Sequence, residues 1–108
     1  MEDSKFLTLL GFCRKSGKLV TGTEKVTYLV KGGKNCLVML ADDISEKTEK
    51  ELKFFSKKGR AVIIRVPFNT EEVSHAIGTV AGVVATSDDG FLKAILDCLN
   101  KSQGGKDE

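Results

Sequence analysis

The chain has 108 residues, of which 41% are hydrophobic and 30% charged, which is the balance of one ordinary globular domain with a single core. Its net charge of +2 is too small to indicate nucleic-acid binding by itself, but the charge is unevenly distributed. Residues 1–40 carry seven Lys or Arg against three Asp or Glu, whereas residues 61–108 carry four against seven. A local basic surface of this kind is compatible with a phosphate contact.

The sequence does not indicate membrane insertion or secretion. Its longest apolar run, Cys36–Ala41, is far shorter than the roughly 20 residues that a membrane-spanning helix needs. The first residues are acidic where a signal peptide is basic, and Arg14 and Lys15 interrupt the first apolar stretch. We therefore expect a cytoplasmic protein that makes no contact with a membrane.

The cysteines predict neither a disulfide framework nor a metal site. Cys13, Cys36 and Cys98 stand singly in apolar segments, no two of them have CxxC spacing, and His75 is the only histidine. A zinc site needs four ligands at a recognisable spacing. We therefore interpret the cysteines as small buried hydrophobic residues in a reducing compartment, and we expect no metal and no cofactor.

The first half of the chain alternates helical and extended patterns. A first helix is indicated by apolar residues at i, i+3, i+4 and i+7, namely Phe6, Leu9, Leu10 and Cys13. This helix should end at Gly17, and Leu19–Thr21 predicts a short strand after it. Thr23 has the chemistry of an N-cap for a second helix that ends at Gly32. Because Cys36–Ala41 is continuously apolar, it predicts a strand buried on both faces.

The second half of the chain continues this alternation. Ser45 is predicted to cap a third helix, and Ala61–Val66 is predicted to form the next buried strand, ended by Pro67. Asn69 and Glu72 have the spacing of a capping box at the start of a fourth helix.

The last strand is predicted at Gly82–Thr86, and the final helix is predicted to begin after Ser87, Asp88 and Asp89. The order of elements is then α-β-α-β-α-β-α-β-α. Apolar strands separated by helices predict an α/β fold with a central sheet covered on both sides, a three-layer α/β/α sandwich. We expect one domain over residues 1–100 and a disordered polar tail over residues 101–108.

No motif for catalysis is present in the sequence. It contains no GxGxxG, no GxxxxGKS/T and no GxSxG. Asp42 and Asp43 follow a buried strand, where catalytic acids often stand, but no second acidic cluster joins them. Two solvated turn residues are the better interpretation, and His75 is interpreted as a surface or boundary residue. We therefore expect a protein that is not an enzyme.

The start of the second predicted helix is the strongest candidate for a binding site. A strand passes into a helix at Gly22, so backbone N–H groups of the first turn are available to an anion. Lysines flank this point in the sequence, namely Lys18, Lys25, Lys31 and Lys34. Tyr28 adds an aromatic ring one turn into the helix. This pattern is typical of an RNA contact, but a solvated lysine face with a half-buried tyrosine explains it about equally well.

Several segments have a distinctive order and spacing when they are taken together. They are Gly17–Gly22, Gly33–Lys34, Leu37–Asp43, Val66–Pro67 and His75–Gly78. In this arrangement the chain resembles the ribosomal L-seven-Ae, kink-turn-binding superfamily, and Val83–Phe91 resembles especially its bacterial YlxQ-like branch. The resemblance runs from about Lys5 to Leu99, which is nearly the whole chain.

The resemblance implies a mixed four-stranded sheet in the sandwich and non-catalytic binding of structured RNA. The expected partners are kink-turns, RNA duplexes bent sharply at a bulge flanked by tandem sheared G·A pairs, with ribosomal RNA among the candidates. Members contact this RNA with a Gly-x-Asn-Glu segment that opens the second helix, with a lysine one turn later and with an apolar loop before the last strand. The matching positions here are Gly22, Thr23, Glu24, Lys25, Tyr28, Thr79, Val80 and Ala81.

This chain departs from the family pattern at three of these positions, because Glu24 and Lys25 replace Asn-Glu and Tyr28 replaces the lysine. Lys25 cannot accept a hydrogen bond from a guanine amino group, whereas the carboxylate of Glu24 can. We expect the RNA-binding residues to be Lys18, Gly22, Thr23, Glu24, Lys25, Tyr28, Lys31, Lys34, Thr79, Val80 and Ala81. The alternative is a protein-interaction module on the same fold, as in the Gadd45 relatives, without specific RNA binding.

Overall fold

A computed structural model describes the backbone of residues 2–104 and the side chains of residues 5–57 and 59–100. Helices and strands alternate along this part of the chain in the predicted order. They are α1 (Glu2–Lys15), β1 (Val20–Thr21), α2 (Thr23–Lys31), β2 (Cys36–Leu40), α3 (Glu46–Phe55), the short 3₁₀ helix η1 (Ser56–Lys58), β3 (Ala61–Arg65), α4 (Thr70–Ile77), β4 (Val83–Thr86) and α5 (Asp89–Gly104). The predicted α/β class is therefore confirmed.

The four strands form one mixed sheet in the order β1-β4-β2-β3. β2 and β3 are parallel, with Cys36 opposite Ala61, and α3 makes the crossover that parallel neighbours require. β4 is antiparallel to both of its neighbours, β1 and β2. The mixed four-stranded sheet implied by the family resemblance is confirmed.

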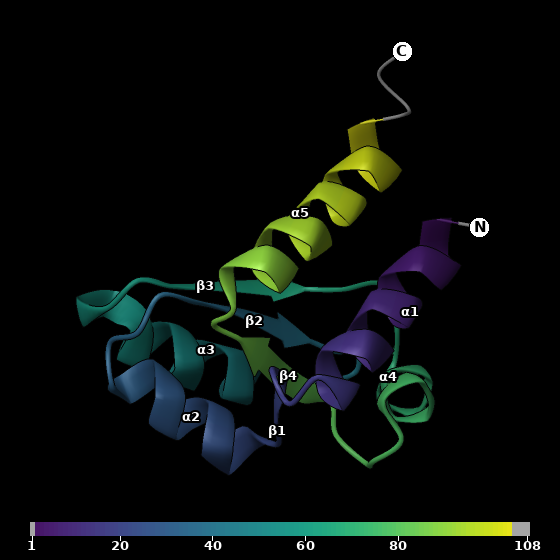
Figure 1. The fold of residues 1–108 in the computed structure, drawn as a ribbon. Helices are drawn as coiled ribbons and strands as arrows, with labels where there is room; N and C mark the ends of the chain where they lie inside the picture. Colours follow the sequence, from purple (N-terminus) through teal and green to yellow (C-terminus); the bar gives the residue numbers. More distant parts are fainter. Residues whose placement is uncertain (1, 105–108) are drawn as a thin grey trace.

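Helices cover both faces of the sheet, which makes the three layers of the sandwich (Figure 1). α2 and α3 pack together on one face, whereas α1, α4 and α5 lie on the other. Alternate residues of β2 point to the two layers: Leu37 and Met39 pack with the α1 side, and Val38 and Leu40 pack with α2 and α3. All of β2 is buried, as its continuous apolar run predicts.

β3 is the exception to the prediction of buried strands. It lies at an edge of the sheet, and each of its residues is only partly buried or exposed; the side chain of Val62 is 50% exposed. The run Ala61–Val66 is apolar except for Arg65 and so resembles that of β2, but an edge strand has a neighbour on one side only. Of this run only Val66, which follows β3, is buried.

Two of the predicted helix caps, which depend only on residues within one turn of the helix start, are confirmed. The Ser45 hydroxyl accepts a hydrogen bond from the Thr48 N–H at 3.2 Å and begins α3. Asn69 and Glu72 form the predicted capping box at the start of α4. At the start of α5, the Asp88 carboxylate accepts a hydrogen bond from the Phe91 N–H at 3.0 Å.

The C-terminal helix extends beyond the predicted end of the domain at residue 100. α5 continues to Gly104, so its last four residues fall within the segment 101–108 for which the composition predicts disorder. Residues 105–108 of that segment lie outside the described residues.

The cysteines are free thiols in or near the core. Cys13 and Cys36 are buried and Cys98 is half-buried, which fits their interpretation as small hydrophobic residues. Burial raises the pKa of the Cys13 and Cys36 thiols, which disfavours the reactive thiolate. In the part of the chain that the structure describes, no three His, Cys, Asp or Glu side chains are grouped to hold a metal ion. No helix among these residues has the length and apolarity to span a bilayer.

Candidate nucleic-acid interface

Gly22 connects β1 to α2 through a backbone conformation that favours glycine. Its φ is +100° and its ψ is +146°, its N–H donates to the Val83 carbonyl at 2.9 Å, and its carbonyl accepts from the Val26 N–H at 3.0 Å. Gly22 is therefore the N-cap of α2, and the prediction that Thr23 occupies this position is wrong. Because no side chain caps α2, the N–H groups of its first turn remain available to an anion.

Replacing Gly22 by alanine is expected to lower the free energy of unfolding by about 1–3 kcal/mol, because an L side chain is strained at this φ even though the added carbon meets no neighbour. The measurement is urea denaturation followed by circular dichroism. Gly32→Ala is the matched control. Because Gly32 has an ordinary helical φ of −71°, this variant should lower the free energy of unfolding much less. Equal losses from the two variants would contradict the role of the positive φ.

The loop before β4 lies beside the start of α2 because Gly22 is hydrogen-bonded to Val83. α4 fixes this loop through Ser74, whose hydroxyl accepts from the Ala81 N–H at 2.9 Å and donates to the Ala81 carbonyl at 3.2 Å. This contact buries the Ala81 side chain in the core, at 7% exposure, and leaves Val80 at the tip of the loop 87% exposed. Of the three loop residues expected to touch RNA, the structure therefore presents Val80 fully, Thr79 in part and Ala81 hardly at all.

The first turn of α2 is open to solvent next to this loop. Thr23, Glu24 and Lys25 are exposed, and Tyr28 follows them one turn later with 83% of its surface exposed. We call these groups the α2 N-terminal surface, which comprises Gly22, Thr23, Glu24, Lys25, Tyr28, Thr79 and Val80. It combines open N–H groups, one cation, one carboxylate, an aromatic ring and an apolar tip, the kinds of group that contact phosphates and bases in RNA.

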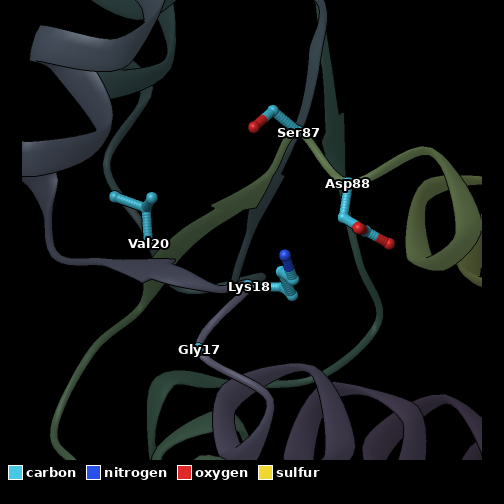
Figure 2. Close-up of a pocket in the computed structure, with 5 residues that line it drawn as sticks. All are labelled: Gly17, Lys18, Val20, Ser87 and Asp88. Carbon is cyan, nitrogen blue, oxygen red and sulfur yellow. The ribbon is translucent and has the colours of Figure 1, made fainter.

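The other predicted lysines lie away from this surface. Lys31 is the last residue of α2 and Lys34 lies three residues beyond it, and the nine residues of the helix separate its two ends by roughly 13 Å. Lys18 lies at the opposite end of β1 from Gly22, where it lines a hollow of 280 Å³ with Gly17, Val20, Ser87 and Asp88 (Figure 2). The sequence placed these lysines with Gly22 because they are near it along the chain, but the fold does not bring them together.

The loop after β2 is hydrogen-bonded to the start of α4, a link that sequence reasoning missed. The Asp43 carboxylate accepts hydrogen bonds from the Thr70 hydroxyl at 2.7 Å and from the Thr70 N–H at 2.9 Å. The hydrogen bond from the Thr70 hydroxyl is the main reason why the pKa of Asp43 lies below its usual value. Asp42 is exposed, as expected of a solvated turn, but Asp43 holds the start of α4 and is more than a solvated turn residue.

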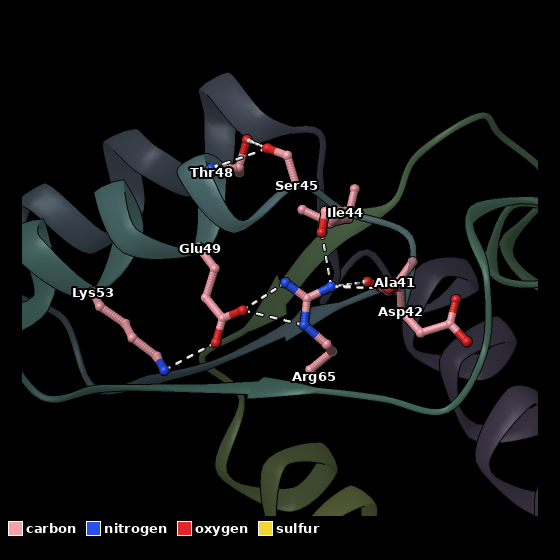
Figure 3. Close-up of polar contacts among 8 residues, drawn as sticks. All are labelled: Ala41, Asp42, Ile44, Ser45, Thr48, Glu49, Lys53 and Arg65. Carbon is pink, nitrogen blue, oxygen red and sulfur yellow. Dashed lines mark hydrogen bonds and ion pairs between the residues drawn. The ribbon is translucent and has the colours of Figure 1, made fainter.

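Arg65, at the end of β3, holds the same loop from the other side (Figure 3). One guanidinium nitrogen, Nη1, donates to the carbonyls of Ala41, Asp42 and Ile44 at 3.2, 3.0 and 2.8 Å. The guanidinium also donates to the Glu49 carboxylate of α3. Since these partners are 16 to 24 residues away in sequence, no local pattern indicates them.

Comparison with known proteins gives a consistent family assignment. Residues 4–95 match the model of the Ribosomal protein L7Ae/L30e/S12e/Gadd45 family. The RNA-binding protein YlxQ of Enterococcus faecium is 32% identical over 89 residues, which are 82% of this chain and 85% of YlxQ. The large ribosomal subunit protein eL30 of Methanocaldococcus jannaschii is 27% identical over 93 residues, which are 84% of each chain.

Solved structures share the fold as well. A protein of unknown function from Bacillus halodurans superposes with a TM-score of 0.78 at 30% identity, over 89% of this chain and 97% of that one. The 15.5kD RNA binding protein of Giardia lamblia has a TM-score of 0.67 at 17% identity, over 95% of this chain and 88% of its own, which shows a common fold. The match to the family model over most of the chain shows that this protein belongs to the Ribosomal protein L7Ae/L30e/S12e/Gadd45 family.

Proposed function

We propose that this protein binds structured RNA at the α2 N-terminal surface and has no catalytic activity. The observation that carries the proposal is the hydrogen bond from Gly22 to Val83, because it sets the uncapped start of α2 beside the exposed tip of the Val80 loop. Family membership supports the proposal, as does the likeness to YlxQ, which is named as an RNA-binding protein.

Each group of this surface has a distinct role in the proposed complex. The positive end of the α2 dipole and the free N–H groups after Gly22 attract a phosphate, and Lys25 adds a full positive charge. Tyr28 offers a face on which a base can stack. Val80 supplies an apolar contact across the RNA groove. Glu24 is the acceptor in this set, so we assign it to the amino groups of guanine.

The RNA we propose is a kink-turn, in which tandem sheared G·A pairs turn guanine amino groups toward the groove. Ribosomal RNA is one source of such motifs, and the cytosol is the compartment in which the protein would meet it. Glu24 takes the acceptor role that Asn-Glu plays elsewhere in the family, and Tyr28 replaces a lysine contact with a stacking contact.

The test of the proposal is the affinity of Glu24 variants for a labelled kink-turn duplex, measured by fluorescence polarisation. Losing a charged acceptor costs about 1.5–3 kcal/mol, so Glu24→Ala should bind the duplex at least tenfold more weakly. Glu24→Gln keeps the shape and one acceptor and should lose less. The control is a duplex with Watson–Crick pairs in place of the G·A pairs, which should not distinguish the three proteins.

Two outcomes would contradict the proposal. If Glu24→Ala binds the kink-turn more tightly than the wild type, the carboxylate repels phosphate and does not read the G·A pairs. If the wild type binds neither duplex, RNA binding at this surface is refuted, and the protein-interaction alternative on the same fold becomes the better explanation.

A further inference from the structure

Two stretches of the chain contain no acidic residue, and the fold brings them together. Residues 25–41 and 52–70 hold eight Lys or Arg and no Asp or Glu. β2 and β3 lie one in each stretch and pair in parallel with Cys36 opposite Ala61, so the residues just before the two strands lie side by side. The backbones touch there, because a Cβ added to Gly59 would be 2.8 Å from the Cα of Gly33. Lys34 and Arg60, both exposed, therefore flank one junction.

Two lysines near this junction, Lys31 at the end of α2 and Lys57 just after α3, lie over the two aromatic rings that end α3. The Lys31 ammonium is 4.4 Å from the ring centroid of Phe55, and the Lys57 ammonium is 5.4 Å from that of Phe54. The two rings pack edge to face with 5.6 Å between their centroids. Phe54 is nevertheless 63% exposed, so much of its ring is available to a ligand.

We call this cluster the distal patch, which comprises Lys31, Lys34, Phe54, Lys57 and Arg60. The helix dipole favours cations near the C-terminal ends of α2 and α3, which accounts for Lys31 and Lys57. It does not account for Lys34 and Arg60 just before the strands, nor for the exposed ring of Phe54 beside the Lys57 ammonium. Lys53 is not part of the patch, because its ammonium pairs with Glu49 at 2.9 Å.

We propose that the distal patch is a second RNA contact, an inference that rests on the proposed function and extends it. The four cations neutralise phosphates, and the exposed face of Phe54 stacks on an unpaired base. A phosphodiester chain is the partner whose charge and flat rings complement this set. One RNA that docks at Gly22 reaches the patch along α2, whose two ends are roughly 13 Å apart, and Tyr28 lies between them.

The salt dependence of binding tests the cations. In the full chain, the double variant Lys34→Ala/Arg60→Ala should bind a kink-turn duplex with a single-stranded overhang more weakly, and the slope of log K against log salt should become shallower by roughly 1.5–2. Lys5→Ala/Lys93→Ala is the matched control, because it removes two exposed cations from α1 and α5 on the other layer. This control should leave the slope unchanged.

Variants of Phe54 test the stacking contact. Phe54→Ala should lower affinity for the overhang duplex roughly tenfold, whereas Phe54→Tyr, which keeps the aromatic face, should bind like the wild type. Neither change should alter affinity for the same duplex without the overhang. Equal losses from both variants, or a loss from Phe54→Ala that persists without the overhang, would overturn the stacking contact.

The two proposals fail in different ways. If the wild type prefers the kink-turn to its Watson–Crick control but the Lys34→Ala/Arg60→Ala slope equals that of the Lys5→Ala/Lys93→Ala variant, the distal patch is refuted and the α2 N-terminal surface stands. If the preference for G·A pairs is absent but the salt dependence of the Lys34→Ala/Arg60→Ala variant changes as predicted, the distal patch is supported and the kink-turn assignment is refuted. A wild type that binds no RNA refutes both.

Discussion

Arg65→Ala is expected to lower the free energy of unfolding at pH 7 by about 2–3 kcal/mol. Hydrogen bonds from a charged donor contribute about 1.5–3 kcal/mol each, but water can replace those to the exposed Asp42 carbonyl and in part the one to Ile44. The carbonyl of the buried Ala41 keeps only the Ile44 N–H, at 3.2 Å, and the Glu49 carboxylate loses both of its hydrogen bonds from the guanidinium. The measurement is urea denaturation followed by circular dichroism, and Arg65→Lys should recover only part of the loss, because an ammonium cannot reproduce the planar fork.

Arg60→Ala is the control for removing an arginine from the same region, and as an exposed surface change it should shift stability by less than about 0.5 kcal/mol. The pKa of Glu49 gives a second readout, because hydrogen bonds from Lys53 and then from Arg65 hold it below its usual value. A carboxylate with a lowered pKa in the folded state stabilises the fold above its unfolded pKa, and this contribution is lost as the pH falls through the folded pKa.

The stability gap between wild type and Arg65→Ala should therefore narrow below about pH 4, near and under the unfolded pKa of a glutamate. It should not close, because the hydrogen bonds to the three carbonyls do not titrate. A gap that stays constant from pH 7 to 3 would show that the link to Glu49 contributes nothing. A gap below about 0.5 kcal/mol at pH 7 would show that Arg65 does not hold the loop.

The parts of the fold that could be predicted from the sequence depend on residues close together in the chain or on a clear pattern of apolar residues. The capping box of Asn69 and Glu72 and the N-cap Ser45 need only three residues of context. The continuous apolar run of β2 predicts burial on both faces correctly, because β2 lies in the interior of the sheet. The run in β3, which is apolar except for Arg65, predicts burial wrongly, because its apolar residues do not show that the strand lies at an edge.

In the candidate site, too, the sequence predicts the local features and misses those that depend on the fold. Gly22 and the lysines near it in the sequence predict the start of α2 correctly, but the capping chemistry of the Thr23 side chain predicts the wrong N-cap, because the φ of Gly22 is not visible in the sequence. Proximity along the chain places Lys31 and Lys34 with Gly22, although the length of α2 separates them from it. The acid-free stretch 52–70 was a visible signal for the distal patch. Joining it to residues 25–41 requires the parallel register of β2 and β3.

Val80→Glu is expected to weaken binding of the kink-turn duplex more than tenfold while leaving the fold intact. Val80 is 87% exposed at the tip of its loop, so its replacement removes no core packing. In the proposed complex the side chain is covered by RNA, and burying a valine contributes about 1.5 kcal/mol or more, which corresponds to about tenfold in affinity. A carboxylate at the same point adds repulsion by phosphate. The measurement is fluorescence polarisation, with thermal unfolding to check stability.

Asn100→Glu is the control, because Asn100 is also exposed and the change in net charge is the same, but it lies in α5 on the other layer, away from both proposed RNA contacts. It should change affinity much less. Val80→Ser separates the two contributions: it should lose the apolar contact but keep the salt dependence of the wild type, because no phosphate contact is removed. If Asn100→Glu weakens binding as much as Val80→Glu, net charge alone governs the affinity, and the apolar tip is not part of the RNA contact.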